Sequence, residues 1–289
     1  IHSWSLQRFM ESVNLRRSLP DELEKDRGPR NKKLKTTWIW LTAKAEKLFF
    51  KDGKARQRVK MYQVRNYDKV AWMKGYLSKH RDAVLIAFLY DSIFLTLLAA
   101  DKSNRVIISE RGDPEQSMHS STVKAFFELQ FKQADHIVFQ SPNVRQWYRD
   151  HFSLDGTVIP NPITPGLPEP HQDIRKKRIV NFCRISTQKN LRLLVNAFER
   201  FYQTHPDYEL YIYGDAVGNG TEGYIESVRD LISRKTCKNS IHLLPSLREI
   251  HTEILDYAMF VSSSDYEGMS NSMLEAMAIG LPTICTDCP

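Results

Sequence analysis

The sequence predicts an α/β fold with two doubly wound, Rossmann-like domains that face a cleft. Its 289 residues are enough for two domains of about 150 residues each. From residue 83 onward, short apolar runs alternate with amphipathic stretches, a pattern typical of parallel sheets covered by helices. Five prolines between residues 160 and 170 interrupt this alternation. Because such proline density excludes helix and central strand, we expect a linker between two halves.

These observations set the expected boundaries. An N-terminal domain is expected over residues 1–164, a Pro-rich linker over 165–177 and a C-terminal domain over 178–289. The chain begins with Ile1 rather than Met, and both domains are expected to be incomplete, the first at its start and the second at its end.

Composition narrows the class of protein. Apolar residues make up 42% and charged residues 26%, which is ordinary for a soluble globular protein and excludes a disordered chain or a disulfide scaffold. Only Cys285 and Cys288 form a C-x-x-C pair, so no zinc site is predicted, and the thiols indicate a reducing compartment. No secretory signal is evident in residues 1–30.

The charge is unevenly distributed along the chain. Residues 1–81 carry a net charge of +13 and residues 82–289 carry −6. The basic residues 1–81 could bind nucleic acid, anionic lipid headgroups or a phosphorylated substrate. A solvated lysine-rich surface would also explain their charge.

The first half contains fewer clear elements. Residues 1–81 are the least informative, although Trp38–Phe50 predicts a helix. The apolar stretch Val84–Ala100 is too short and too polar at its centre for a membrane span, and it predicts a strand, Ala83–Leu89, followed by a helix capped by Asp91 or Ser92. The β-branched and amphipathic runs that follow predict strands at Arg105–Ser109, His136–Gln140 and Thr157–Pro160, helices at Thr122–Gln133 and Asn143–Asp150, and a loop at Glu110–Pro114.

The second half alternates more regularly. One helix has Leu191, Leu194, Val195 and Phe198 on one face, and another is stopped by Gly280. The predicted strands are Arg178–Phe182, Tyr208–Tyr213, Ser240–Leu244, Ala258–Ser262 and Thr283–Thr286, and the predicted helices are Asn190–Tyr202, Tyr224–Arg234, Leu247–Leu255 and Ser270–Ala278.

A strand-to-helix turn in the last third indicates a phosphate site. Gly268 lies in this turn, and the helix begins near Ser270. The free backbone N–H groups and the dipole of a helix N-terminus attract anions. Glu267 precedes the helix and Glu275 lies inside it; since carboxylates repel phosphate, both are better suited to accept hydrogen bonds from sugar or ribose hydroxyls.

Two cations are expected at the same edge of the sheet. Arg184 follows the strand Arg178–Phe182, and Lys189 opens the next helix. Fixed cations there could neutralise a diphosphate and stabilise it as a leaving group.

Several motifs resemble the family-four retaining glycosyltransferases of GT-B architecture, also called glycosyl transferases group 1. The segments CRISTQKNLRLLVNAF, YELYIYGD and SDYEGMSNSMLEAMAIGLPTICTD are similar to the donor-binding domain of that family, over residues 178–289. VIISERGDP, ADHIVFQS and VIPNPI resemble the acceptor domains of bacterial members that build surface polysaccharides, including capsule or lipopolysaccharide.

The resemblance implies a role for each motif residue. Arg184 and Lys189 would hold the diphosphate, Glu275 the ribose, and Glu267 the transferred sugar. The other implied donor-binding residues are Gly214, Asp215, Gly268, Met269, Ser270 and Asn271. On the acceptor side of the cleft the resemblance implies Glu110 and Arg111, although Arg111 stands where many members have a histidine. Cys183 stands where the family usually has a glycine.

The implied function is a metal-independent, retaining transfer of a hexosyl group, without a cofactor, from a nucleotide-sugar to a polysaccharide or lipid-linked oligosaccharide. The expected partners are the donor, a glycan or lipid-pyrophosphate acceptor and an anionic membrane surface, with no nucleic acid, at the cytoplasmic inner face of the membrane. A catalytically incomplete nucleotide-sugar-binding or scaffold protein of the same fold is the alternative. A dehydrogenase is the further alternative. It would need G-x-G-x-x-G immediately after a strand, whereas the one such spacing in the chain, Gly218–Gly223, begins five residues after the predicted strand Tyr208–Tyr213.

Overall fold

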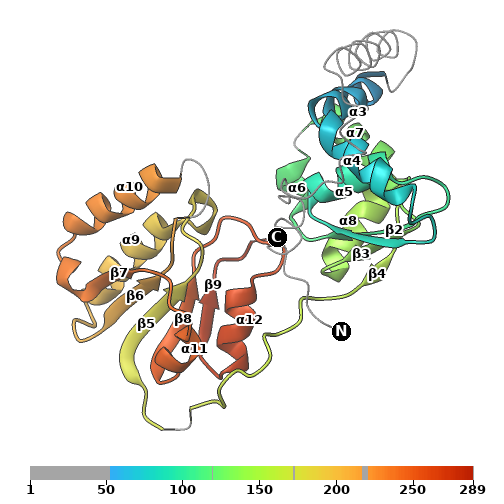
Figure 1. The fold of residues 1–289 in the computed structure, drawn as a ribbon. Coiled ribbons are helices and arrows are strands. Elements are labelled where there is room, and N and C mark those ends of the chain that lie inside the picture. The colour runs from blue at the N-terminus through green and yellow to red at the C-terminus, as the bar shows by residue number, and fades with distance from the viewer. Residues whose placement is uncertain (1–52, 119, 172, 217–220, 289) are drawn as a thin grey trace, which may run out of the picture. The chain divides into compact units, whose positions relative to one another are not determined.

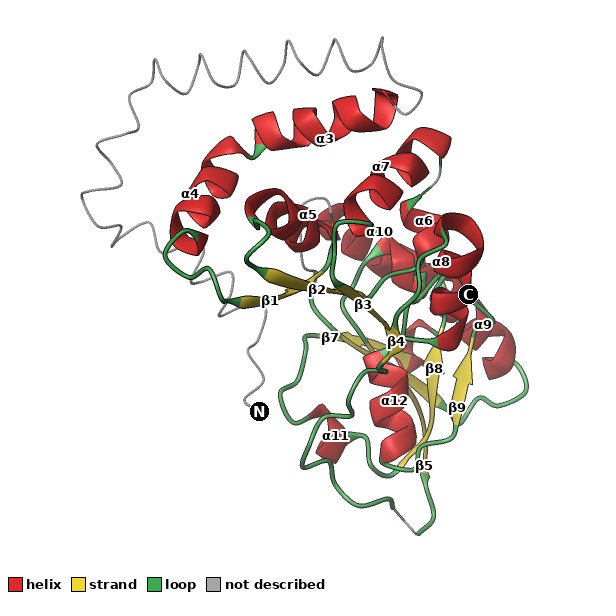
Figure 2. Ribbon diagram, turned by 90° about the vertical axis from the view of Figure 1, so that its right-hand side faces the viewer, coloured by secondary structure: helices red, strands yellow, loops and turns green. Residues whose placement is uncertain are grey.

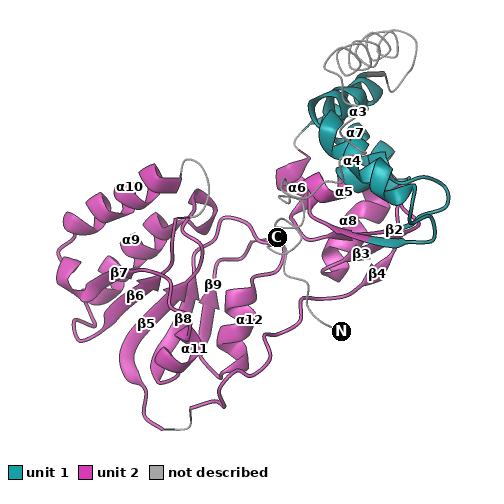
Figure 3. Ribbon diagram, in the orientation of Figure 1, with its two compact units in different colours: residues 1–85, 94–106, 120–133 teal, residues 86–93, 107–119, 134–289 magenta. Residues whose placement is uncertain are grey.

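The computed structural model describes residues 53–118, 120–171, 173–216 and 221–288. The predicted helix Trp38–Phe50 lies outside these residues. The chain divides into two compact units, one of residues 1–85, 94–106 and 120–133, the other of 86–93, 107–119 and 134–289 (Figure 3). Both sheets fall mainly in the second unit, so this division is not the one predicted at the proline-rich linker, and the domain boundaries there stay a prediction.

The first unit packs around aromatic rings. It contains α3 (Gly53–Arg65), α4 (Tyr67–Leu77) and α7 (Ser121–Phe131), with Ser120 capping α7 through a hydrogen bond to the Val123 amide. The ring of Phe94 lies 4.7 Å from that of Phe126 and 5.7 Å from that of Tyr62. Edge-to-face contacts of this kind join α3 to α7.

The first sheet comprises β1 (Val84–Phe88), β2 (Arg105–Glu110), β3 (His136–Phe139) and β4 (Thr157–Val158), in that order, with β2, β3 and β4 parallel (Figure 2). Its helices are α5 (Tyr90–Ala99), α6 (Pro114–Ser117) and α8 (Pro142–Phe152).

Two local predictions in this part are corrected. The helix after β1 begins at Tyr90, so Asp91 and Ser92 lie in its first turn and do not cap it; Leu89 makes the turn with a left-handed φ of 66°. The loop after β2 ends earlier than expected, because Asp113 caps α6 and Pro114 occupies its first turn.

The second sheet is fully parallel and has the order β7-β6-β5-β8-β9 (Figure 1). Its strands are β5 (Lys176–Phe182), β6 (Glu209–Tyr213), β7 (Ile241–Leu244), β8 (Tyr257–Ser262) and β9 (Thr283–Cys285). The direction of winding reverses between β5 and β8. Ligands of open α/β sheets bind at the carboxyl ends of the strands at such a switch point.

Helices cover both faces of this sheet. They are α9 (Leu191–Tyr202), α10 (Thr221–Ser233), α11 (Ile250–Glu253) and α12 (Asn271–Ala278), with short 3-10 turns at Thr187–Lys189 and Lys238–Ser240. Successive β5 residues point to opposite faces: Ile179 packs with Leu194 of α9, and Val180 packs with Ala276 of α12. Both strand faces are therefore buried, as in other parallel sheets.

The helix predicted over Leu247–Leu255 is shorter than expected. Only Ile250–Glu253 is α-helical, because the chain turns into β8 where the Tyr257 amide donates to the Ile254 carbonyl at 3.0 Å. None of the described helices is both long enough and apolar enough to span a bilayer.

Candidate active site

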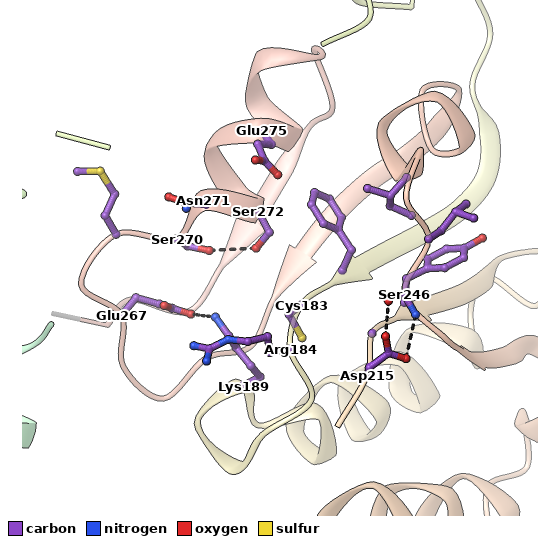
Figure 4. Close-up of a pocket in the computed structure, with 16 residues that line it drawn as sticks. Cys183, Arg184, Lys189, Asp215, Ser246, Glu267, Ser270, Asn271, Ser272 and Glu275 are labelled. Atoms are coloured by element: carbon purple, nitrogen blue, oxygen red, sulfur yellow. Dashed lines mark hydrogen bonds and ion pairs between the residues drawn. The ribbon is translucent and has the colours of Figure 1, made fainter. Parts of the chain in front are cut away.

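A cavity of about 470 Å³ opens at the carboxyl ends of β5, β6 and β7 and at the start of α12 (Figure 4). Its volume falls in the usual range of small-molecule sites. It occupies the switch point of the second sheet. The lining residues are Phe182, Cys183, Arg184, Lys189, Tyr213, Gly214, Asp215, Ser246, Leu247, Ile250, Glu267, Met269, Ser270, Asn271, Ser272 and Glu275.

A close backbone approach forms the floor between β5 and β6. A Cβ atom on Gly214 would lie 2.0 Å from the Cys183 carbonyl oxygen. The Cys183 amide donates to the Tyr213 carbonyl at 3.0 Å, and the Ile185 amide to the Asp215 carbonyl at 3.0 Å. Only a glycine at position 214 therefore lets the backbone pairing of β5 and β6 continue beyond the strand ends to the floor of the cavity.

Lys189 and Glu267 meet in the cavity. The Lys189 ammonium contacts Oε1 of Glu267, and the Ser264 hydroxyl donates to the same oxygen at 2.6 Å. These side chains are 13% and 16% exposed, respectively. Asn190, in a left-handed conformation, caps α9 and also bonds Asp265 at 2.7 Å. The first turn of α9 and the loop after β8 are thereby fixed against each other.

Arg184 extends toward this pair (Figure 4). Within the described part of the chain it has no ion pair or side-chain hydrogen bond, and it is exposed. Figure 4 shows its guanidinium beside the Lys189–Glu267 contact. An incoming anion would meet one unengaged cation and one that is already shared with a carboxylate.

The N-terminus of α12 faces the same space. Ser270 is its N-cap residue but makes no side-chain capping bond; its hydroxyl lies 3.2 Å from that of Ser272. Among the described residues no side chain caps the first-turn N–H groups, and the positive end of the helix dipole adds to their attraction for an anion.

Glu275 lies one turn further along α12. Its Oε2 is 3.0 Å from Nε2 of His251, and its Oε1 accepts a 2.5 Å hydrogen bond from the Thr164 hydroxyl. The Glu275 and His251 side chains are each 18% exposed.

Asp215 uses both carboxylate oxygens within the protein. Oδ1 accepts from the Ser246 amide at 3.2 Å, and Oδ2 accepts from the Ser246 hydroxyl. These bonds lower the pKa of Asp215. Asp215 thus joins the loop after β6 to the loop after β7 at the cavity wall.

Glu110 is the buried residue at the end of β2. The sequence places Glu110 on the acceptor side of a cleft, but its side chain is buried, at 2% exposure. It accepts hydrogen bonds from the Gly112 amide at 2.7 Å and the Tyr148 hydroxyl at 3.0 Å, and burial raises its pKa to about 7. On the alternating strand β2 it shares the buried face with Val106 and Ile108 and shapes the following loop, and an acceptor contact by Glu110 stays a prediction.

Arg111 is the outward residue of this loop. Its guanidinium bonds the Asn161 side chain and the Ile159 carbonyl, the latter at 3.4 Å. It therefore fixes the chain just after β4, and an acceptor contact by Arg111 stays a prediction.

The cavity gathers all but one of the predicted donor-binding residues; Gly268 is not among those that line it. Sequence reasoning missed Ser246, Leu247 and Ile250. They follow β7, so the rule that strand ends share one edge was the available signal. The described residues contain no group of three potential metal ligands, and independence of a metal stays a prediction.

Comparison with known proteins identifies the part of the chain that carries this cavity. Residues 176–289 match the family model described as Glycosyl transferases group 1, and this segment is a domain of that family. An uncharacterized glycosyltransferase of Methanocaldococcus jannaschii is 24% identical over 228 residues, or 72% of this chain and 54% of that protein. The GtfA subunit of a UDP-N-acetylglucosamine–peptide N-acetylglucosaminyltransferase of Streptococcus agalactiae is 21% identical over 57% of this chain and 33% of its own length.

Solved structures share the fold. A complex of S. aureus TarM with UDP matches with a TM-score of 0.62 at 16% identity, over 76% of this chain and 45% of that one. Anabaena HepE in complex with UDP and glucose matches with a TM-score of 0.60 at 16% identity, over 75% and 62%. The fold is that of GT-B glycosyltransferases. The chain spans about half the length, or less, of the curated relatives it matches.

Proposed function

We propose that this protein is a retaining glycosyltransferase, which moves a hexosyl group from a nucleotide-sugar to a polysaccharide or lipid-linked oligosaccharide. One observation carries the proposal. Two cations, an uncapped helix N-terminus and two carboxylates converge on one cavity at a sheet switch point, within a glycosyl transferases group 1 domain.

Each group has a role in holding the donor. Arg184, Lys189 and the first-turn N–H groups of α12 bind the diphosphate, Glu275 accepts from the ribose hydroxyls, and Glu267 accepts from the transferred sugar. The Lys189–Glu267 contact supports this assignment. A donor would place phosphate oxygens against Lys189 and sugar hydroxyls against Glu267, so each partner exchanges one bond for another of similar strength.

The same groups promote the reaction. The bond between the sugar C1 and the diphosphate oxygen breaks, and the cations with the helix N-terminus stabilise the departing charge. The acceptor hydroxyl attacks the oxocarbenium-like C1 from the face that the diphosphate leaves, which retains the configuration, and its proton passes to the oxygen of the departing diphosphate. Because the leaving group is stabilised by fixed protein charges, we propose that neither a metal ion nor a cofactor takes part.

A uridine nucleotide is the first donor to test, since TarM and HepE, which share the fold, were solved with UDP. Calorimetric titration of the protein with UDP-, GDP- and dTDP-sugars should identify one that binds. The acceptor class is then tested by transfer of the labelled sugar to polysaccharide or to lipid-linked oligosaccharide.

Arg184→Ala combined with Lys189→Ala should weaken binding of that donor by more than tenfold, because a charge-assisted hydrogen bond contributes about 1.5–3 kcal/mol. Arg234→Ala, at an exposed position just after α10 and paired with Asp230, is the matched control. Unchanged affinity in the double variant removes both cations from the site. Binding without transfer would favour a nucleotide-sugar-binding protein over an enzyme.

We also propose that the protein works at the inner face of the membrane, attached peripherally. Residues 53–81 contain nine Lys or Arg and a single acidic residue, Asp68. The rings of Trp72 and Tyr76 on α4 and of His80 just after it stack in sequence, with centroids 6.0 and 4.4 Å apart. Basic side chains together with amphipathic rings suit a lipid headgroup layer.

A further inference from the structure

Glu275 depends on a residue outside the cavity. Its Oε2 lies 3.0 Å from Nε2 of His251 in α11. His251 is not among the described residues that line the cavity, whereas Glu275 and Phe182 are. The imidazole therefore contacts the carboxylate from outside the residues that line the cavity.

The imidazole is itself held in place. The ring of Phe182, at the end of β5, meets it edge to face, with centroids 5.6 Å apart at 90°. Ile250, its neighbour in α11, is buried at 7% exposure. His251 is thus fixed by strand β5 on one side and by the core under α11 on the other.

A carboxylate only accepts hydrogen bonds, so the bond to His251 requires a proton on Nε2. This bond fixes the rotation of the carboxylate about its last torsion, which is otherwise soft. Each oxygen keeps a second acceptor position, which remains after the contacts with His251 and Thr164.

We propose that His251 is a positioning residue that makes the site select ribonucleotides over 2′-deoxyribonucleotides. It does so by holding the Glu275 carboxylate at the angle that the 2′-hydroxyl of a ribose requires. The inference rests on the proposed function, in which Glu275 accepts from the ribose. A site built to pair with a hydroxyl rejects the analogue that lacks it, provided that its acceptor is held in place.

The test is the ratio of two dissociation constants. The protein is titrated calorimetrically with UDP and 2′-deoxy-UDP, and with GDP and 2′-deoxy-GDP, and the tighter-binding pair is used. The unaltered protein should prefer the ribonucleotide by about tenfold or more, the effect of one charge-assisted hydrogen bond.

His251→Ala should reduce this preference at least fivefold, while affinity for the 2′-deoxynucleotide stays within twofold. His251→Gln should restore most of it, because its amide N–H can occupy the place of Nε2. The matched control is His242→Ala, which removes another His–Glu pair, His242 with Glu209 at 3.2 Å, from the same sheet but outside the cavity lining. The His242→Ala variant should keep the full preference for the ribonucleotide over the 2′-deoxynucleotide.

The other outcomes separate the inference from its premise. If Glu275→Gln loses the preference and His251→Ala keeps it, His251 does not position Glu275. If His251→Ala weakens both nucleotides equally, its role is only structural, and the inference is again overturned. If Glu275→Gln keeps the preference, or if none of the four nucleotides binds, the proposed function is at fault, and the inference falls with it.

Discussion

At the scale of single residues, the two glutamates of the cavity have different neighbours. Glu267 contacts Lys189 and Ser264, beside the uncapped start of α12, whereas Glu275 contacts His251 and Thr164. Glu267 is therefore next to the cation proposed for the diphosphate and its leaving bond. Glu275 lies about one helical turn further along α12, away from this cation.

This separation predicts different kinetic effects. Glu275→Gln should mainly raise KM for the donor, by about tenfold, because the ribose interaction is made equally before and during the reaction. Glu267→Gln should mainly lower kcat, because its partner is the reacting sugar. Steady-state kinetics of sugar transfer decide the matter. A Glu267→Gln variant that changes KM alone contradicts the role assigned to it.

Glu110 gives a prediction about stability. Burial raises its pKa to about 7 from an ordinary value of 4.5. The folded protein then binds more protons than the unfolded chain between these two values. The stabilising contribution is complete below pH 4.5 and is lost as the pH rises through 7. A shift of this size corresponds to on the order of 3 kcal/mol.

Glu110→Gln cannot titrate, so its melting temperature should fall less between pH 5 and pH 8 than that of the unaltered protein. Thermal unfolding followed by circular dichroism across this range measures the difference. Glu115→Gln, at an exposed position of α6, is the control and should retain the pH dependence. Parallel curves for Glu110→Gln and the unaltered protein would show that Glu110 does not titrate in this range.

At the scale of elements, the predictable parts are those with strong periodicity. Strands β5 to β9 were predicted within two or three residues, because their buried faces give continuous apolar runs. Helices α3 and α4 were not predicted: GKARQRVKMYQVR has few apolar residues, so its helical form depends on packing against α7. The extent of α11 was overestimated, since apolar Ile254 and Leu255 continue the pattern after the helix has ended.

The residues of the candidate site, like the helices and strands, could be predicted where the sequence pattern is strong. Residues next to the strands β5 and β8 were found because charged or glycine residues interrupt apolar runs there. Ser246 and Leu247 carry no such signal, and only the pairing of β6 with β7 brings them to the cavity. The burial of Glu110 depends on which face of β2 is covered, which periodicity alone does not decide.

Helix α12 gives a prediction about metals. Its N-terminus and the two cations supply the charge stabilisation that Mg²⁺ or Mn²⁺ provides in other transferases, and the chain contains no Asp-x-Asp pair. Transfer should therefore continue in the presence of EDTA at more than half of its initial rate. Loss of activity in EDTA with recovery on addition of Mn²⁺ would contradict this mechanism.

At the scale of the whole molecule, the charge asymmetry is the feature that the cavity does not use. The cavity lies in residues 182–275, which belong to the acidic part of the chain, whereas the basic excess lies in residues 1–81. Two helices of the described basic region, α3 and α4, present Lys54, Arg58, Lys69 and Lys74 as exposed side chains. These basic side chains could bind an anionic partner electrostatically, separately from the cavity.

An anionic membrane is the proposed partner of this region, and it gives the last prediction. A basic side chain near such a surface contributes about 1 kcal/mol, so two charge reversals on α4 are enough to be measured. The protein should float with anionic liposomes at low salt and be released at 1 M salt, where the Debye length is about 3 Å. Lys69→Glu with Lys74→Glu should weaken flotation, and Arg229→Glu on α10 with Arg234→Glu just after it should leave flotation unchanged. Equal flotation with neutral and anionic liposomes would instead indicate a solvated basic surface, because only an electrostatic contact distinguishes the two lipids.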